Sequence, residues 1–277
     1  MAKKKKKAKK TGDTIVTMLV LILLVWVWNK YIQPSNAENA HTQIEIPACD
    51  SLEVVKTPSS VESEIVRYPG FTVSFNPQHH IPNYVAWTLT GNEAQGEEVK
   101  KRTDNFAPDP NVYGCPTLND YKGSGYDRGH MAPAGDMKWS VDAMNASFLL
   151  TNMTPQAHAL NKGAWRTLEE KCREWAKRDS AVIIVCGPIL TDKLTERIGN
   201  TGVTVPKRFF KVVLSPSISQ GIGFIMDNGQ VKGGMQAAAV SIDSVEAVTG
   251  YDFFSALPDD IENRIEAECN FPRMSKK

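Results

Sequence analysis

One run of six apolar residues, Ala181-Val-Ile-Ile-Val-Cys186, most constrains what this chain can fold into. The run has no polar position, so it predicts a buried central strand, which ends at Gly187-Pro188. A helix is predicted just before it, from about Asn161 to Lys177. The apolar residues of that helix recur at three- and four-residue spacing: Trp165, Leu168, Cys172 and Trp175. That spacing gives the helix one buried face.

Further strands and helices are predicted along the rest of the chain. Strands are expected at Phe71–Phe75, Tyr84–Thr90, Phe148–Asn152, Phe209–Leu214 and Ile222–Met226. Short helices are expected at 142–146, 241–249 and 259–268, and a long surface loop at 100–125. No internal repeat is present. The pattern predicts one α+β domain over residues 61–277, with a mixed or antiparallel central sheet and flanking helices.

The N-terminus carries the features of a membrane-targeting segment. Seven lysines within the first ten residues form a basic stretch, 1–13, before the apolar run Ile15–Trp28. Residues 14–32 are long enough to anchor the chain in a membrane. The alternative is a cleaved signal peptide, since Ser35-Asn36-Ala37 offers the small residues that cleavage needs. With either alternative, the domain is exported to the periplasmic or extracellular side. It stays anchored if the segment is retained and is secreted if the segment is cleaved. A linker at 33–60 precedes the domain.

The charge of the chain is balanced only because of that basic stretch. The full sequence has 32 basic and 31 acidic side chains. Without the first seven lysines, 25 basic and 31 acidic side chains remain, a net charge of −6. Proteins that bind nucleic acid usually carry a basic surface. Any site for a polyanion here is therefore expected to be a local patch, assisted by a bound cation.

Five cysteines follow the apolar run, and none forms a Cys-x-x-Cys pair, so a structural zinc site is not expected. Cys49 and Cys269 lie near the two ends of the folded part, which are often close in space. A disulfide between them is the first expectation for an exported domain.

The segment 123–133 concentrates groups that suit acid–base and phosphate chemistry. Asp127, Arg128 and His130 surround Gly129, which permits a close approach to the backbone. Histidine can act as a base near neutral pH, and the arginine fork suits phosphate oxygens. The structural alternative is an ion pair between Asp127 and Arg128, with His130 capping a turn.

The predicted helix at Asn161 offers a place for a metal ion. Asn161 is at the start of the buried face of the helix, and a buried amide needs partners. Its carbonyl oxygen suits Mg²⁺, which takes few protein oxygens. Glu169, two turns on, is placed to hold metal-bound waters. The structural alternatives are an N-cap for Asn161 and a solvated glutamate for Glu169.

Two segments together, YDRGHMAPAGDMKWS and LLTNMTPQAHALNKGAWRTLEE, resemble the DNA/RNA non-specific endonuclease family, which includes endonuclease G. The downstream VPKRFFKVVL is also similar to the endonuclease G group. The resemblance covers roughly residues 65–255. It implies a ββα-metal element: a short strand at His130, another at Leu149–Asn152, and the helix from Asn161.

The resemblance also implies roles for residues of this chain. His130 matches the general base, Asn161 the direct magnesium ligand and Arg128 a phosphate-contacting residue. Asn152 matches a residue that steadies the site, and Glu169 the holder of metal-bound waters. Arg102 matches, more loosely, a family arginine before an Asp-Pro. The expected enzyme is a Mg²⁺-dependent endonuclease, with Mn²⁺ as an alternative metal, that hydrolyses DNA and RNA and leaves a 5′-phosphate.

Two other functions remain open on the sequence. One is a membrane-tethered module that binds nucleic acid without cutting it, although the acidic domain disfavours binding without a metal. The other is a phosphodiesterase for small nucleotides, whose site the loop at 100–125 would narrow.

Overall fold

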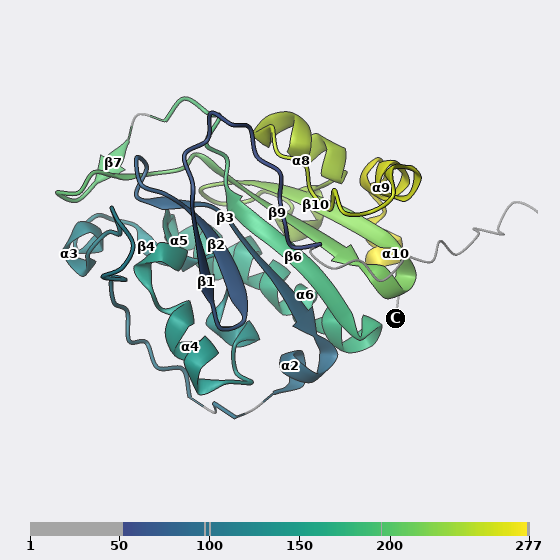
Figure 1. Cartoon of the computed structure of the whole chain (residues 1–277), viewed down its shortest axis with the longest axis horizontal. Helices are drawn as coiled ribbons and strands as arrows, with labels where there is room; N and C mark the ends of the chain where they lie inside the picture. Colours follow the sequence, from purple (N-terminus) through teal and green to yellow (C-terminus); the bar gives the residue numbers. More distant parts are fainter. Residues whose placement is uncertain (1–51, 97, 100, 195, 276–277) are drawn as a thin grey trace, which may run out of the picture. The chain divides into compact units, whose positions relative to one another are not determined.

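The core of the computed structural model is a seven-stranded sheet in which every neighbouring pair is antiparallel, in the order β1-β2-β3-β6-β9-β10-β11 (Figure 1). The structure describes residues 52–275 except 97, 100 and 195. The strands of the sheet are β1 (Glu64–Tyr68), β2 (Phe71–Asn76), β3 (Ile81–Thr90), β6 (Ala181–Pro188), β9 (Arg208–Ser215), β10 (Gln220–Asp227) and β11 (Ala239–Val240). The predicted α+β class, with an antiparallel central sheet, is confirmed.

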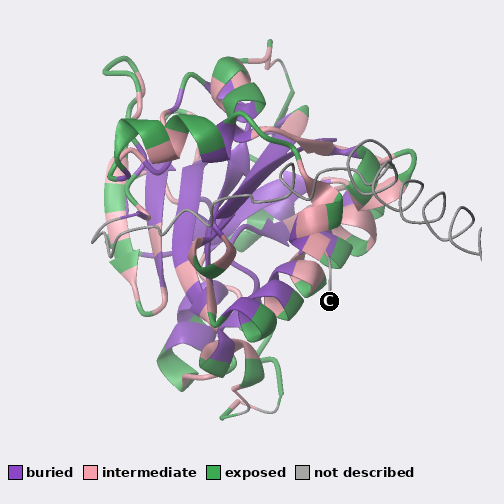
Figure 2. Ribbon diagram, turned by 90° about the vertical axis from the view of Figure 1, so that its right-hand side faces the viewer, coloured by how far each residue is buried: buried purple, intermediate pink, exposed green. Residues whose placement is uncertain are grey.

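Strand β6 lies at the centre of the sheet, as its apolar sequence predicts. Val182, Ile184 and Cys186 pack into the core on the side of helix α6 (Arg166–Asp179). Ile183 and Val185 belong to a second core on the opposite face. Figure 2 shows the buried strands inside, with exposed residues on the outer surfaces of helices and loops. The strand is therefore apolar at every position because both of its faces are covered.

The second core is covered by α8 (Ile242–Thr249) and α9 (Asp259–Glu266), close to the predicted helices. The predicted helix at 142–146 corresponds to α4 (Val141–Ser147). The remaining short elements are α2 (Gly91–Gln95), α3 (Leu118–Tyr121), α5 (His158–Leu160), α7 (Gly234–Ala237), α10 (Phe271–Ser275) and the hairpin of β7 (Arg197–Ile198) with β8 (Val203–Thr204). Helix α3 lies inside the stretch predicted as a loop.

A separate two-stranded sheet pairs β4 (Asp127–His130) with β5 (Met153–Gln156), and a helical segment follows it directly. The sequence pattern predicts a strand at Phe148–Asn152, and the family resemblance places it at Leu149–Asn152. Both predictions are wrong by about four residues, since β5 begins at Met153. Leu150–Asn152 form a 3-10 turn instead, since the backbone N–H of Asn152 bonds back to the carbonyl of Leu149 at 3.0 Å. The strand–strand–helix order of the prediction is retained.

The helical segment after β5 is not the single regular helix that the periodicity predicts. Helix α5 passes into a π-helical turn, Asn161–Trp165, and only then into α6. Gly163 has non-helical angles, φ −102° and ψ −117°, within this turn. Such π turns inside helices are frequent at functional sites. This π-helical turn begins at Asn161, the residue expected to bind the metal ion.

The start of the described chain packs onto the domain. Leu52 and Val55, within the stretch predicted as a linker, are buried in the second core. Lys56 and Asp252 exchange two backbone hydrogen bonds of 3.0 Å. The end of the predicted linker is thus part of the folded unit.

The predicted anchor, 14–32, and Cys49 of the predicted disulfide lie outside the described residues. Cys115, Cys172, Cys186 and Cys269 are free cysteines. Within residues 52–275, apart from the three gaps, no helix has the length and apolar character to cross a membrane.

Candidate active site

Strand β4 positions the first motif, and its glycine is required by packing. A Cβ atom on Gly129 would lie 2.2 Å from the Oε1 atom of Gln156, on the paired strand β5. The close approach expected at this glycine is therefore made by a side chain of the domain itself. Any larger residue would have to displace the buried side chain of Gln156, whose Cδ and Cγ atoms would lie 2.4 and 2.5 Å from the added Cβ.

His130 is buried in an aromatic enclosure. Its ring contacts Phe106 and Phe148 edge to face, with centroids 5.5 and 5.0 Å apart, and its Nε2 atom has no hydrogen-bond partner. Burial, aided by the charges of Arg102 and Arg128, lowers the pKa of His130 to about 3. The imidazole is therefore neutral at neutral pH, with a proton-accepting nitrogen available.

The two arginines stack on the same aromatic rings. The guanidinium of Arg128 lies 4.0 Å from the centroid of Phe106, and that of Arg102 lies 4.9 Å from the centroid of Phe148. Contacts of this kind between a cation and a ring hold a guanidinium in place. Arg102 also donates from Nε to Oδ1 of Asp104 at 2.6 Å, whereas Arg128 has no acidic partner among the described residues. The charge of Arg128 is thus left available for an anion.

Asn152 fixes the backbone just after His130 by hydrogen bonds. Its Oδ1 accepts from the backbone N–H of Ala132 at 2.9 Å, and its Nδ2 donates to the carbonyls of Ala132 and Ser147 at 2.8 and 2.9 Å. The residue is fully buried. All its hydrogen-bonding groups are used, so it can position the site but has no group left for a metal ion or substrate.

Asn161 is held by the acid of the first motif. Its Nδ2 donates to Oδ2 of Asp127 at 2.8 Å, and the Nδ1 atom of His158 lies 3.0 Å from the same oxygen. Asn161 has helical angles and no N-cap bond, so the N-cap alternative is wrong. The ion pair between Asp127 and Arg128 is also absent, since both residues are described and Asp127 pairs with His158. The Oδ1 atom of Asn161 accepts no hydrogen bond from described residues and can serve as a ligand.

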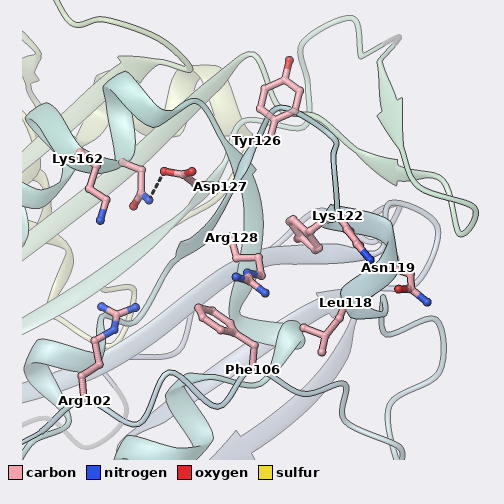
Figure 3. A pocket seen from close by; sticks show the side chains of 11 residues that line it. Arg102, Phe106, Leu118, Asn119, Lys122, Tyr126, Asp127, Arg128 and Lys162 are labelled. Carbon is pink, nitrogen blue, oxygen red and sulfur yellow. Dashed lines mark hydrogen bonds between the residues drawn. The ribbon is translucent and has the colours of Figure 1, made fainter.

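A pocket of about 450 Å³ opens beside these residues. Figure 3 shows Arg102, Arg128 and Lys162 on its walls, each from a different element. With Lys122 there are four cations in the lining, against the single carboxylate of Asp127. The charge balance of the sequence predicts such a local basic patch on an acidic domain. Phe106 also lines the pocket and contacts His130, which itself does not line it.

Glu169 belongs to a buried charge network next to the site. The ammonium of Lys211, on β9, lies 4.5 Å from the ring of Trp165 and 5.3 Å from that of Trp87. Burial raises the pKa of half-buried Glu169 to about 7, and the charge of Lys211 opposes that rise. The indole N–H of Trp165 donates to the carbonyl of His130 at 3.3 Å. The network therefore connects the central sheet to the backbone of His130.

Asp136 is the second acid of this network. Its carboxylate accepts hydrogen bonds from Arg173 at 2.7 Å and from the indole of Trp87 at 3.2 Å. Lys211 is almost fully buried. In the sequence, Lys211 is the feature that could have indicated this network. It is a lysine within the largely apolar strand Arg208–Ser215, and lysine is rarely fully buried.

The structure thus brings Arg102, Arg128 and Asn161 to one pocket and places His130 directly behind its wall. Asn152 and Glu169 stand outside the lining. The residues that the sequence did not point to are Phe106, Phe148, Lys122, Lys162 and Lys211. Lys162 directly follows Asn161 and Phe148 directly precedes the second motif, so both could have been considered from the sequence. Phe106 and Lys122 lie outside both motifs, and no spacing rule connects them to the motifs.

Two antiparallel strands followed by a helix, carrying a neutral histidine and an asparagine beside a basic pocket, define the ββα-metal class of nuclease. The family model for DNA/RNA non-specific endonucleases matches residues 50–260. The chain belongs to the DNA/RNA non-specific endonuclease family and is a hydrolase of nucleic acids.

Several relatives support the assignment. The chain is 35% identical to a nuclease of Nostoc sp. over 215 residues, 72% of this chain and 76% of that protein. It is 33% identical to the mitochondrial Nuclease 1 of Schizosaccharomyces pombe, over 73% of this chain and 69% of the relative. A crystal structure of an EndoG/EndoGI complex contains a chain that superposes with a TM-score of 0.66 at 26% identity, over 73% of this chain and 94% of that one.

Proposed function

We propose that this chain cuts DNA and RNA internally by Mg²⁺-dependent hydrolysis of phosphodiester bonds, with His130 as the general base. The observation that carries the proposal is the neutral, buried imidazole with an unpartnered Nε2, directly behind a pocket with four cations. A base must be deprotonated when substrate arrives, and this enclosure keeps His130 in that state.

In the proposed reaction, the unprotonated imidazole nitrogen of His130 accepts a proton from the attacking water as the oxygen of that water approaches phosphorus in line. The bond from phosphorus to the 3′ oxygen breaks, and the displaced oxygen takes up a proton from a second water, which leaves a 5′-phosphate and a 3′-hydroxyl. The resulting imidazolium would be stabilised by the negative charge of the phosphate. Since Phe106 lies against His130 on the pocket side, its ring has to shift when substrate enters.

The residues present fit a divalent cation. Asn161 has an uncommitted carbonyl oxygen that Asp127 orients through the amide nitrogen. Glu169, whose carboxyl group senses the charge of Arg102 in the pocket lining, is proposed to hold water around the ion. Members of this family are generally dependent on divalent metals. Mg²⁺, or Mn²⁺ in its place, would stabilise charge that develops on the phosphate. A single neutral ligand leaves the full charge of the ion available to the substrate.

Arg128 and Arg102 are proposed to bind the phosphates on either side of the cut. Both are on the pocket wall with their guanidinium groups stacked on rings. Contacts to phosphates carry no sequence information, so the enzyme is expected to cut with little sequence preference.

The test is a cleavage assay of His130→Ala in Mg²⁺, with and without EDTA, on duplex DNA, single-stranded DNA, RNA and a dinucleotide. Loss of the base is expected to lower the rate about 10²–10⁴-fold on all polymers. His80→Ala, at a histidine outside the pocket lining, serves as the control. An active His130→Ala protein would refute the mechanism. Cleavage confined to the dinucleotide would favour the nucleotide phosphodiesterase, and binding without cleavage the binding module.

We also propose that residues 14–32 hold the domain at a membrane, on its periplasmic or extracellular side. The support is the lysine-flanked apolar run of the sequence. Fractionation of cells that express the full chain, followed by protease treatment from outside, tests this. The chain is expected in the membrane pellet with its domain accessible. A domain found free in the medium would show that the segment is cleaved.

A further inference from the structure

Three acids gather between α8 and α9, on the face of the sheet opposite helix α6. Asp243 and Glu246 come from α8, and Glu266 is the last residue of α9. Within the described residues, one carboxylate oxygen from each of the three lies within 4.8 Å of the others. Like charges at this separation repel, so the arrangement needs a partner.

The buried member of this cluster has an oxygen with no partner. Glu266 is only 5% exposed, and its Oε1 atom is buried without a hydrogen bond. Glu262, one turn earlier on α9, has a second such oxygen. Glu246 uses one oxygen to accept from the backbone N–H of Phe253 at 2.8 Å. A buried unpaired carboxylate is costly, and buried charges are normally paired or bound to metals.

We propose that Asp243, Glu246 and Glu266 form a binding site for a Ca²⁺ ion, separate from the active site. Carboxylate oxygens from two helices are the donors that hard divalent cations take, and the exposed Asp243 leaves a side open to water. Ca²⁺ accepts six to eight oxygens in a flexible arrangement, which suits a cluster completed by water better than the strict octahedron of Mg²⁺ does.

A bound Ca²⁺ ion would link helices α8 and α9 where they cover the second core. Ile242 and Val245 of α8 and Ile265 of α9 are buried side by side in that core. The ion would bridge the helices beside these residues, so its effect is on stability. Because the catalytic pocket is on a different part of the domain, cleavage is expected to be unaffected. The proposal does not depend on the proposed catalytic mechanism.

The competing occupant is a proton. Burial, together with the charges of Glu246, Glu262, Asp243 and Asp252, raises the pKa of Glu266 to about 9. A protonated Glu266 would relieve the repulsion without a metal. An experiment must therefore distinguish bound Ca²⁺ from a neutral carboxyl group.

The experiment measures the melting temperature of the full chain, stripped with EDTA, while CaCl₂ alone is added. An Asn161→Ala background removes the proposed catalytic ligand. The expected result is a rise in melting temperature that grows with the logarithm of the Ca²⁺ concentration and reaches roughly 5–10 °C at a concentration 100-fold above the Kd. No rise up to about 10 mM, above the range of weak extracellular Ca²⁺ sites, would overturn the proposal.

Glu266→Gln distinguishes the two occupants. If Ca²⁺ binds, this variant is expected to lose the rise, while the exposed control Glu268→Gln keeps it. A rise that persists in Glu266→Gln would also overturn the site. If Glu266→Gln melts higher than the parent without metal and Ca²⁺ has no effect on the parent, the cluster holds a proton. Asp243→Asn, at an exposed position, repeats the test should Glu266→Gln fail to fold, with calorimetric Ca²⁺ binding as its readout.

Discussion

At the scale of single residues, the protonation of His130 is set by its neighbours. Phe106 and Phe148 exclude water from the imidazole, and the charges of Arg102 and Arg128 disfavour a further positive charge. A bound phosphate would neutralise the two arginines and raise the pKa of His130 towards the working pH. In the proposed mechanism, substrate binding would therefore make His130 a stronger base than it is in the free protein.

Removal of the Phe106 ring should expose His130 to water. Because burial is the largest cause of its low pKa, the pKa in Phe106→Ala is expected to rise from about 3 towards the usual value near 6.5. NMR titration of the histidine ring signals measures this directly. Phe271→Ala, which removes a ring packed on Trp175 and Phe224, is the control and should leave His130 unchanged. Titration of His130 near pH 6.5 in the parent protein would contradict the prediction.

Asp127 is expected to act on metal affinity through Asn161. Without the 2.8 Å hydrogen bond from Nδ2, the amide can rotate and the carbonyl oxygen is no longer directed. Asp127→Ala should therefore raise the Mg²⁺ concentration for half-maximal cleavage about 10–100-fold, with a smaller change in kcat at saturating Mg²⁺. Asp127→Asn retains an acceptor oxygen and should recover much of the affinity. Equal Mg²⁺ requirements in all three proteins would exclude this role.

At the scale of elements, strand β9 joins the sheet to the site through one buried lysine. Lys211 lies between Trp87 and Trp165 and is surrounded by Glu169 and Asp136, whose charges favour its protonated form. A buried charge of this kind adds to stability only while its partners remain.

Lys211→Met should lower the free energy of unfolding by about 3–5 kcal/mol, because it leaves buried acids without their cation. It should also shift the pH dependence of kcat. Lys211 lowers the pKa of Glu169, so its loss raises that pKa further and moves the acid limb to higher pH. Urea unfolding and pH–rate profiles measure the two effects. Lys207→Met, at an exposed lysine just before β9, should change neither. An unshifted acid limb would show that Glu169 does not need to be ionised.

At the scale of the whole molecule, the charges are separated between the pocket and the rest of the domain. Residues 52–277 hold 24 basic and 27 acidic side chains, a net charge of −3, yet four cations line the pocket. The surface outside the pocket therefore repels a polyanion, and binding depends on few contacts.

A weak dependence on salt follows from this distribution. Each phosphate contact contributes about 0.9 to the slope of log affinity against log salt concentration, so four cations give a slope of roughly 4 or less in magnitude. The slope of log KM against log KCl, at constant Mg²⁺ and with duplex DNA as substrate, is the measurement. Lys122→Ala should reduce it by about 1. A slope near 10 would reveal a much larger basic surface than the pocket provides.

The sequence by itself determined the order of the elements and the residues of the two motifs. Strand β6 is apolar at every position and helix α6 has one apolar face, and these local patterns survive in any fold that buries them. The motif residues Arg128, His130 and Asn161 could be named because they lie in the two short, unbroken segments that resemble the family. The strand within the second motif was misplaced, since its position is set by pairing with β4 and not by local composition.

Only the tertiary structure decided how those residues are tuned. Phe106 meets His130, Lys211 meets Trp165 and Glu266 meets Asp243 across long stretches of chain. Burial and the charges of distant neighbours set the pKa of each buried group, and no sequence period encodes such contacts. The neutral imidazole of His130, the uncommitted oxygen of Asn161 and the unpaired oxygen of Glu266 therefore appear only when the chain is folded.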